Sequence, residues 1–473
     1  MQTGFESVSE NSDTSFDHHA IYDLDSEPED EYGKGGYMKL NDHTEIAEQY
    51  SILQKIGWGH GGIVYLAKDK QTNAFVALKI LKSHRYYRQE FKDELKILKK
   101  IPNSNYTVKI IEHFIIEIAS QDHTVVVYEL MGVTLYEILK HYKFSGLPIA
   151  LCRFIGKEIL KGLAYFHEEQ GIIVGDLRLK NILLPMTKAQ QTSLEENGVV
   201  QEKLDYAIFK HTDTPHAILN KYLGTSFVLE TGKKAKSKGK KGKKAANPKD
   251  ILKKLNRFGL VNEEFSIKFN NLSNSCLIGN RPAREFPLLN YSSPESILKL
   301  PYTTQSDMWS FGCIMFELVT GHYLFEPYKG KHYKKEEDLL GQMQETLGKI
   351  PLELVNQSEV QGKFFDETGK LKHLFLMQEW PLKDLLIEKY YLNVEEATGF
   401  CGFLKDILCF DAEKRMNAKQ ALEHKWFKMP SKDNTHLSKE KIKEVDAWVK
   451  KREFEYWQTC FRNEEYKFVS KYK

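Results

Sequence analysis

The stretch that decides the fold is "GIIVGDLRLKNILL", residues 171–184. It places Asp176 five residues before Asn181, with the basic side chain of Arg178 between them. A carboxylate and an amide so close in sequence are candidate residues of an active-site loop. The motifs that precede and follow them in the chain indicate what this loop does.

A glycine-rich motif precedes this loop in "IGWGHGGIVYLAKD", residues 56–69. Its pattern is Gly57-x-Gly59-x-x-Gly62-x-Val64, and a dinucleotide-binding turn shares such glycines. A dinucleotide fingerprint opens a helix, however, whereas strand-like sequence lies on both sides of this motif. A hairpin folded over phosphate groups fits better, because glycine lets backbone amides approach a ligand closely.

A lysine and a glutamate follow the glycine motif at positions that suit a phosphate-binding cleft. Lys79 ends "VALK", fifteen residues after Val64, and a lysine there can neutralise the α- and β-phosphates of a nucleotide. Taken alone, it would be interpreted as a strand lysine that faces solvent. Glu94 lies in "FKDELKIL", the helical stretch of the small domain. We expect it to pair with Lys79.

Three further motifs follow the loop, and together they favour one fold. They are "YSSPESIL" at 291–298, "SDMWSFGCIMFELVTG" at 306–321 and "DAEKRMNAKQAL" at 411–422. In this order, after the glycine hairpin and the loop of Asp176, they resemble the protein kinases. The resemblance implies an α+β bilobal fold, with a small antiparallel sheet and one helix in the N-lobe and a larger, mostly helical C-lobe.

A closer resemblance is to the SR-protein kinases, which phosphorylate serines in the arginine–serine repeats of splicing factors. The matching stretches are "EYGKGGY" at 31–37, "IGWGH" at 56–60 and "GHYLFEPYKGKHYKKEEDLL" at 321–340. The resemblance runs from about Glu31 to Phe427. It implies ATP and Mg²⁺ as cofactors and a C-lobe groove for basic peptides.

The same resemblance implies that Asp176 orients the substrate hydroxyl group and that Asn181 ligates magnesium. It also implies further site residues. It implies a nucleotide site that includes Ala77, adenine contacts at the backbone of Glu129 and Met131, and Tyr128 as the gatekeeper. The acidic residues Glu336, Glu337 and Asp338 are candidates for docking an Arg-rich peptide, although an ordinary solvated loop explains them equally well.

The chain departs from the family mainly at the metal-binding end of the site. The family's H-x-D-x-K-x-x-N is "VGDLRLKN" here, with Val174 for the histidine and Arg178 for the lysine. The metal-binding D-L-G is Asn271-Leu272-Ser273, and no Asp or Glu lies between Glu264 and Glu285. Ser292 stands where the family has the arginine of Y-R-S-L-E.

These departures differ in their expected effects. Arg178 still supplies positive charge to a transferring phosphate. Magnesium prefers anionic oxygen, whereas the amides of Asn181 and Asn271 offer only a dipole, so metal binding is expected to be weak. Removing one preorganised group from an active site costs about 10²–10³ in rate. We also expect that Ser273 replaces a glycine whose backbone would adopt a positive φ.

Two functional hypotheses follow. The first is a pseudokinase or strongly impaired serine/threonine kinase that binds nucleotide, Arg-rich proteins or both. The alternative is an active or weakly active kinase that transfers the γ-phosphate of ATP to serines in Arg-Ser-rich splicing factors. Asn271, Ser273 and Val174 favour the first hypothesis, whereas Lys79, Glu94 and Asp176 favour the second.

The 473 residues are expected to divide into four parts. These are a disordered acidic tail (1–30), an N-lobe (31–132), a C-lobe (133–429) with an insert at about 188–262, and a charged, helical extension (430–473). Within the insert, residues 233–244 carry eight lysines in twelve positions. A solvated linker and a nuclear-import or nucleic-acid patch both remain open for this run.

The composition gives further expectations. No run of 18 apolar residues predicts a membrane span, and the six scattered cysteines form no C-x-x-C pair. We therefore expect a monomer in the cytoplasm, the nucleus or both, with reduced thiols. Arg/Ser-rich proteins are the expected partners. No membrane binding is expected. Direct nucleic-acid binding is not expected either, because no aromatic residues interrupt the lysine run.

Overall fold

The computed structural model describes residues 27–40, 44–102, 104–118, 120–186, 188–197, 267–281, 288–374 and 377–429, with residues 443, 444 and 447. The lysine run, most of the predicted insert, most of the C-terminal extension and the predicted tail up to residue 26 therefore lie outside the described residues.

The chain forms two compact units. The first comprises Met1–Lys92, Lys109–Leu130 and Thr192–Glu202, and the second comprises Asp93–Val108, Met131–Gln191 and Lys203–Lys473. The predicted boundary at residue 132 lies close to the junction of Leu130 and Met131. Helix α2 (Arg85–Leu98) contributes its first eight residues to the first unit and the remainder to the second. Helix α5 (Lys188–Asn197) is likewise shared.

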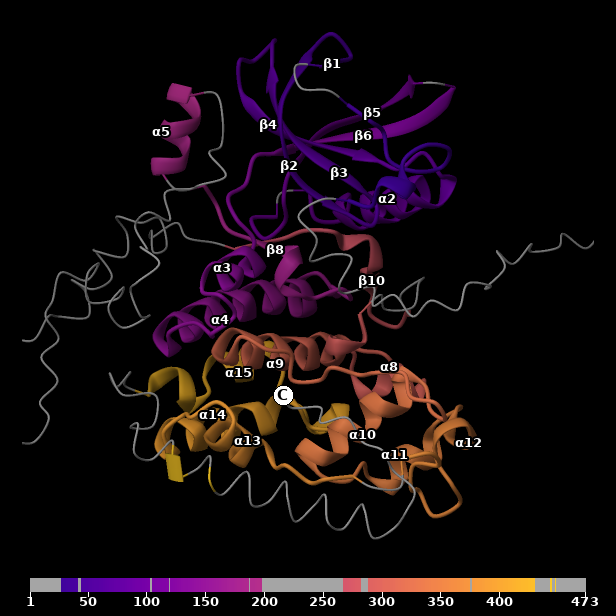
Figure 1. The fold of residues 1–473 in the computed structure, drawn as a ribbon, viewed down its shortest axis with the longest axis vertical. Helices are drawn as coiled ribbons and strands as arrows, with labels where there is room; N and C mark the ends of the chain where they lie inside the picture. Colours follow the sequence, from indigo (N-terminus) through magenta and orange to yellow (C-terminus); the bar gives the residue numbers. More distant parts are fainter. Residues whose placement is uncertain are drawn as a thin grey trace, which may run out of the picture. The chain divides into compact units, whose positions relative to one another are not determined.

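The first unit is built on an antiparallel sheet with the strand order β1-β2-β3-β4-β6-β5 (Figure 1). The strands are β1 (Glu45–Ile46), β2 (Tyr50–Gly59), β3 (Gly62–Asp69), β4 (Phe75–Leu81), β5 (Ile110–Ile118) and β6 (Gln121–Glu129). Strands β2 to β6 coincide with short apolar runs between residues 50 and 130, and helix α2 includes the helical stretch "FKDELKIL". Strand β1 was not predicted.

The N-terminal segment joins this unit earlier than the sequence predicts. Glu27 is only 8% exposed, forms an ion pair with Lys55 on β2 and accepts a hydrogen bond from the hydroxyl of Tyr32. The prediction that residues 1–30 form a disordered tail is therefore wrong for residues 27–30. A buried carboxylate with two partners is part of the fold.

The second unit is mostly helical. Its described helices are α3 (Leu135–His141), α4 (Ile149–Ala164), α8 (Pro294–Leu298), α9 (Thr304–Thr320), α10 (Lys335–Leu347), α11 (Leu352–Gln357), α12 (Gln361–Phe364), α13 (Leu382–Glu388), α14 (Val394–Ile407) and α15 (Ala418–Leu422). No described helix combines the length and the apolar character that crossing a membrane would require.

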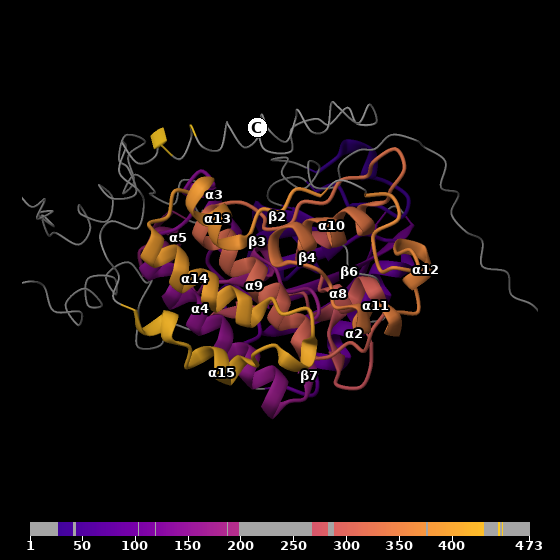
Figure 2. The same ribbon diagram turned by 90° about the horizontal axis from the view of Figure 1, so that it is seen from below.

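Helix α9 is the centre of the second unit. It packs against α4 and α14 (Figure 2), and every residue from Ser306 to Thr320 is buried. Such burial follows from the sequence of this helix, which is apolar nearly all round. Gly321 ends the helix with φ +84°, which a glycine adopts without strain. The apolar side chains of Ile155, Ile159 and Leu163, which share one face of α4, are also buried.

Two short strand pairs complete the second unit and hold the loops of interest. Strand β7 (Ile172–Ile173) pairs with β10 (Cys276–Leu277), and β8 (Ile182–Leu183) pairs with β9 (Lys268–Phe269). Residues 174–181 therefore connect β7 to β8, and residues 270–275 connect β9 to β10. Since both ends of each loop are paired with an end of the other, the two loops lie side by side.

Candidate functional site

The loop of Asp176 is anchored to helix α9 by one buried carboxylate. Asp307 is 1% exposed and accepts hydrogen bonds from the backbone amides of Val174 (2.7 Å) and Gly175 (2.9 Å). Its Oδ2 also lies 2.8 Å from Nε2 of His167. Because this anchor uses backbone amides, it survives the replacement of the family's histidine by Val174, whose side chain is buried in the core.

Gly175 gives the loop its shape. Its φ is +86°, and a Cβ on this residue would lie 2.5 Å from the carbonyl oxygen of Asn274. Both the backbone conformation and the close approach require glycine. The loop of Asp176 and the loop of Asn271 are therefore in direct backbone contact at this point.

The carboxylate of Asp176 has three polar neighbours. Asn181 donates from Nδ2 to Oδ2 and to the backbone carbonyl of Asp176, both at 2.9 Å. Asn271 donates from Nδ2 to the same Oδ2 at 3.3 Å. Nε of Arg178 lies 3.3 Å from Oδ1, as an ion pair without hydrogen-bond geometry. The structure thus brings together four residues predicted from the sequence.

Asn271 has the strained backbone conformation of this segment. Its φ and ψ are 60° and 59°, in the left-handed region where asparagine is enriched. Its Oδ1 accepts a hydrogen bond from the hydroxyl of Ser273 at 3.4 Å, so both ends of the amide are engaged. Ser273 itself belongs to a 3₁₀ turn, Leu272–Asn274, and its φ is not positive. The expectation that Ser273 replaces a φ-positive glycine is wrong, because Asn271 carries that conformation.

Glu94 also acts on this segment. The side chain is buried, and its Oε1 accepts a hydrogen bond from the backbone amide of Leu272 at 3.1 Å. This contact fixes the backbone next to Asn271. The predicted ion pair joins Glu94, in the second unit, to Lys79, in the first, and it stays a prediction because each unit is described by itself.

In the first unit, the predicted nucleotide residues share one face of the sheet. Val64 is directly opposite Lys79, and Ala77 is directly opposite Tyr128. Paired residues of antiparallel strands point to the same side, as do residues two apart along a strand. Gly57, opposite Val64, belongs to the same row. The other face carries the apolar core of this unit, with members such as Ile63, Leu78 and Val127.

The glycines of the hairpin differ in why they must be glycine. A Cβ on Gly62 would lie 2.3 Å from the carbonyl oxygen of Ile80, so packing excludes any other residue there. At Gly57 and Gly59, no described atom lies within 4 Å of a Cβ position. Internal packing therefore explains Gly62, whereas the space beside Gly57 and Gly59 suits the approach of a ligand.

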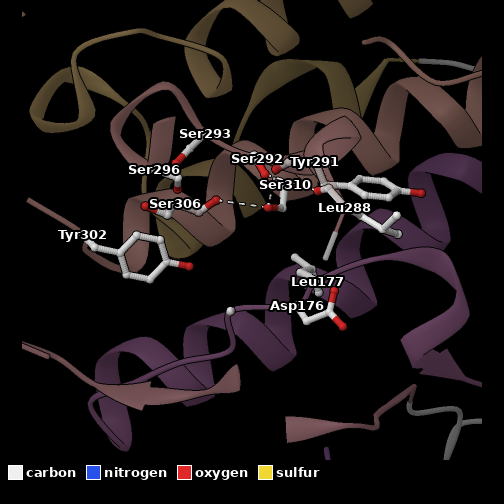
Figure 3. Close-up of a pocket in the computed structure, with 11 residues that line it drawn as sticks. Asp176, Leu177, Leu288, Tyr291, Ser292, Ser293, Ser296, Tyr302, Ser306 and Ser310 are labelled. Carbon is white, nitrogen blue, oxygen red and sulfur yellow. Dashed lines mark hydrogen bonds between the residues drawn. The ribbon is translucent and has the colours of Figure 1, made fainter. Parts of the chain in front are cut away.

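A pocket adjoins Asp176 in the second unit. The described residues that line it are Gly175, Asp176, Leu177, Leu288, Tyr291, Ser292, Ser293, Ser296, Tyr302, Ser306 and Ser310. Figure 3 shows Asp176 on one side and Ser292, Ser306 and Ser310 on the other. The whole hollow, including its part open to solvent, measures about 290 Å³.

The serine hydroxyls of this pocket are turned toward the protein. Ser292 donates to the carbonyl of Leu288 (3.2 Å), Ser306 donates to Oε1 of Glu295 (2.7 Å), and Ser310 donates to the carbonyl of Tyr291 (2.8 Å). A hydroxyl that has donated its proton still has oxygen lone pairs. The pocket therefore presents hydrogen-bond acceptors. Sequence reasoning missed it, although the "YSSPES" stretch already showed the cluster of serines.

A buried ion pair lies next to this pocket, in contact with the lining residue Ser306. Glu295 lies in α8, and its Oε1 is 2.8 Å from Nη1 of Arg415. Burial acts to raise the pKa of Glu295, but the charge of Arg415 and hydrogen bonds from Arg415 and Ser306 outweigh it and lower the pKa from its ordinary value. Both residues stand in motifs found in the sequence, yet the pairing was not predicted.

Comparison with known proteins identifies the family. The protein kinase domain model matches residues 50–203 and 263–427. A serine/threonine-protein kinase SRPK from Physarum polycephalum is 32% identical over 412 residues, which cover 85% of this chain and 92% of the relative. The chain belongs to the SR-protein kinase family. The predicted family and the predicted bilobal α+β kinase fold are thus confirmed.

Two other kinases are similar to this chain over nearly the same share of its length. Protein kinase dsk1 from Schizosaccharomyces pombe is 28% identical over 463 residues, 84% of each chain. SRSF protein kinase 3 from Homo sapiens is 26% identical over 520 residues, 85% of this chain and 90% of the relative. The similarity therefore spans both compact units.

Protein kinases in general use ATP with Mg²⁺, so the fit of the ion to this family member can be tested against its residues. Magnesium takes oxygen ligands in octahedral geometry. Here Oδ2 of Asp176 already accepts from two amides, and Oδ1 of Asn271 accepts from Ser273. The two predicted ligands, Asn181 and Asn271, offer neutral amide oxygens, whereas magnesium is usually bound through one or two carboxylates together with substrate phosphates. This donor set does not fit a tightly held magnesium ion.

The acidic docking residues of this kinase-family chain are largely internal. Glu337 is 3% exposed, and its Oε1 accepts from the backbone amide of His373 at 2.8 Å. Asp338 is 1% exposed and accepts from the amide of Tyr328 and from Nε2 of Gln342. A docking role for these two carboxylates is therefore wrong, because they stabilise the start of α10. Glu336 is partly exposed and lies 3.7 Å from Lys363.

The two residues predicted to contact adenine through their backbone belong to different units. Glu129 ends β6, and its Oε1 accepts from the backbone amide of Lys109 at 2.7 Å. Met131 belongs to the second unit, where it precedes Gly132, whose amide donates to the carbonyl of Leu184 at 2.8 Å. Their roles in nucleotide binding stay predictions.

Proposed function

We propose that this SR-protein-kinase-like chain is a pseudokinase, or a strongly impaired serine/threonine kinase, that acts by binding nucleotide and Arg-rich proteins. The observation that carries the proposal is the hydrogen bond from Nδ2 of Asn271 to Oδ2 of Asp176. An amide stands where the family places the carboxylate that grips the metal ion.

The charge balance supports this proposal. With aspartate at position 271, two carboxylates would face one another, and a divalent cation between them would relieve their repulsion. With asparagine, the amide satisfies Asp176 directly, and the cluster needs no cation to be stable. Without the ion, the γ-phosphate lacks counter-charge, and the loss is expected to be at least about 10²–10³ in rate.

The remaining residues support nucleotide binding. Lys79, Val64 and Ala77 lie on one face of the sheet, and Gly57 and Gly59 leave space for backbone amides to meet phosphate oxygens. In this arrangement Lys79 would neutralise the phosphates of the nucleotide, and the hairpin would cover them.

The pocket beside Asp176 supports binding of basic side chains. Its lining is rich in acceptor oxygens, and no Lys or Arg is among the described residues that line it. Such a surface prefers a ligand that only donates hydrogen bonds, as ammonium and guanidinium groups do. Since Arg178 already contacts Oδ1 of Asp176, neutral oxygens would supply much of the attraction.

An active or weakly active serine/threonine kinase for Arg-Ser-rich splicing factors is the second candidate. The observation that favours it is the hydrogen bonding of Asn181 to Asp176, which holds the catalytic carboxylate in an ordered position. A relative whose name states its substrate class, SRSF protein kinase 3, adds to it. Under this candidate, Asp176 orients the serine hydroxyl and Arg178 attracts the transferring phosphate.

Two measurements separate the candidates. The first is a thermal-shift titration of the full chain with ATP, with and without magnesium or manganese. A shift that does not depend on the metal supports a nucleotide-binding pseudokinase, and a metal-dependent shift supports the enzyme. The second is phosphate transfer to an arginine–serine peptide. Turnover equal to that of an intact SR-protein kinase run alongside would overturn the proposal.

We further propose a cytoplasmic or nuclear monomer that binds no membrane. Imaging of the tagged chain and its mass in solution would test these two points.

A further inference from the structure

The buried hydroxyl of Tyr37 ties the tip of the glycine-rich hairpin to the N-terminal segment, residues 27–38. Tyr37 is 2% exposed and donates a hydrogen bond from its hydroxyl to the carbonyl oxygen of Gly59 at 2.8 Å. Gly59 is the last residue of β2, immediately before the hairpin turn. The contact therefore reaches the tip of the hairpin.

Tyr37 is itself held firmly. Nζ of Lys82 lies 4.2 Å from the centre of its ring, and Lys82 also pairs with Glu31. The backbone of the segment is bound to the start of α2, since the carbonyls of Gly36 and Gly35 accept from the amides of Ser83 (3.1 Å) and His84 (3.2 Å). A hydroxyl on such a rigid support defines the position of the carbonyl it binds.

The other side of the hairpin tip is also in contact with the fold. The ring of His60 packs edge-on against Tyr87, with centroids 5.1 Å apart, and against Tyr86 at 6.3 Å. The carbonyl of Gly61 accepts from the backbone amide of Lys82 at 3.1 Å. The tip is thus held at three successive residues, and Gly59 remains open on the side where a side chain would be.

We propose that Tyr37 is a positioning residue, which fixes the glycine-rich hairpin so that its backbone amides are already arranged for nucleotide phosphates. Pre-arranged donors lose less conformational freedom when a ligand binds. The nucleotide part of this inference rests on the proposed function, whereas the ordering of the hairpin does not.

The test compares Tyr37→Phe with Tyr32→Phe in the full chain. Both substitutions remove one hydroxyl from the same segment and keep the ring. The hydroxyl of Tyr32 donates to Glu27, within the segment itself, so this variant is the matched control. Hydrogen exchange is measured on nucleotide-free protein in a fragment covering residues 57–63, and nucleotide affinity is measured by titration with ATP.

Tyr37→Phe should speed exchange in this fragment about fivefold, the effect of one lost hydrogen bond, and weaken ATP binding by a similar factor. Tyr32→Phe should leave both unchanged. Equal exchange in the two variants, or faster exchange with unchanged ATP affinity, would overturn the inference. If the unaltered chain binds no ATP, the nucleotide part of the proposed function fails, and the exchange result alone decides whether Tyr37 fixes the hairpin.

Discussion

The side-chain amide of Asn271 donates a hydrogen bond to the carboxylate of Asp176, 3.3 Å away. The amide and the carboxylate thus satisfy one another directly, in a place where two carboxylates would repel one another. This relationship leads to the first prediction.

Asn271→Asp should make the protein depend on divalent cations. Without metal, the new carboxylate would face Asp176 and lose the hydrogen bond, and we expect the free energy of unfolding to fall by about 1–3 kcal/mol. Magnesium should reverse this loss, and phosphate transfer to an arginine–serine peptide should rise at least about tenfold. Thermal unfolding with and without magnesium, and a transfer assay, measure these effects. Asn271→Ala is the control, since it removes the hydrogen bond and adds no charge. An equal response of both variants to magnesium would contradict the prediction.

Gly175→Ala should destabilise the second unit more than an ordinary turn substitution. A non-glycine residue at positive φ costs about 1–2 kcal/mol, and here the added Cβ would also lie 2.5 Å from a carbonyl oxygen. Gly279→Ala is the matched control, because Gly279 has φ +90° and no described atom within 4 Å of its Cβ position. Chemical denaturation measures both variants, and equal losses would show that the contact with Asn274 adds nothing.

Glu295→Gln should destabilise the protein at neutral pH by about 3–5 kcal/mol, because Arg415 is then buried without a partner charge. The pKa of Glu295 is lowered from an ordinary 4.5, so its stabilising contribution is present above that value. The contribution is lost as the pH falls through the lowered pKa. The difference in unfolding free energy between wild type and variant should therefore narrow progressively as the pH falls below 4.5. Glu353→Gln, at an exposed glutamate, should change little at any pH.

Ser292→Arg should fill the pocket beside Asp176 with a guanidinium group of the chain itself. Binding of a labelled peptide with arginine or lysine next to serine should weaken about tenfold, whereas a peptide with glutamine at that position should bind poorly to both proteins. Gln357→Arg adds the same charge at an exposed site and is the control. Fluorescence anisotropy measures the affinities. The peptide that binds more tightly, with lysine or with arginine, would identify the cationic group that the pocket prefers. Unchanged affinity of Ser292→Arg for these peptides would show that they do not bind in this pocket.

Much of the fold could be predicted, because periodicity reflects burial directly. The run from 306 to 321 is apolar all round and is the central helix, and the short apolar runs before residue 130 are strands of one sheet. The loop of Asp176 was recognisable because Asp176 and Asn181 are close in sequence, and the structure confirms that they are in contact.

Contacts between residues far apart in the sequence could not be predicted from periodicity. Glu337 and Asp338 look solvated in the sequence, but their partners are the amides of His373 and Tyr328. Asp307 anchors a loop more than a hundred residues earlier in the chain. No local pattern announces such contacts, because the partners are brought together only by tertiary packing.

The position of the left-handed residue was misjudged for a related reason. Family resemblance drew attention to the missing glycine at Ser273, whereas the strained φ belongs to Asn271. Asparagine tolerates this conformation, so the substitution that removes the negative charge costs the backbone little.

The strand pairs β7–β10 and β8–β9 hold the two loops without any contribution from the side chain of residue 271. The backbone frame of the two loops therefore does not depend on which side chain stands at position 271. Only the exchange of one NH₂ group for an oxygen separates the asparagine there from an aspartate, so the charge at this point can change while the architecture stays intact.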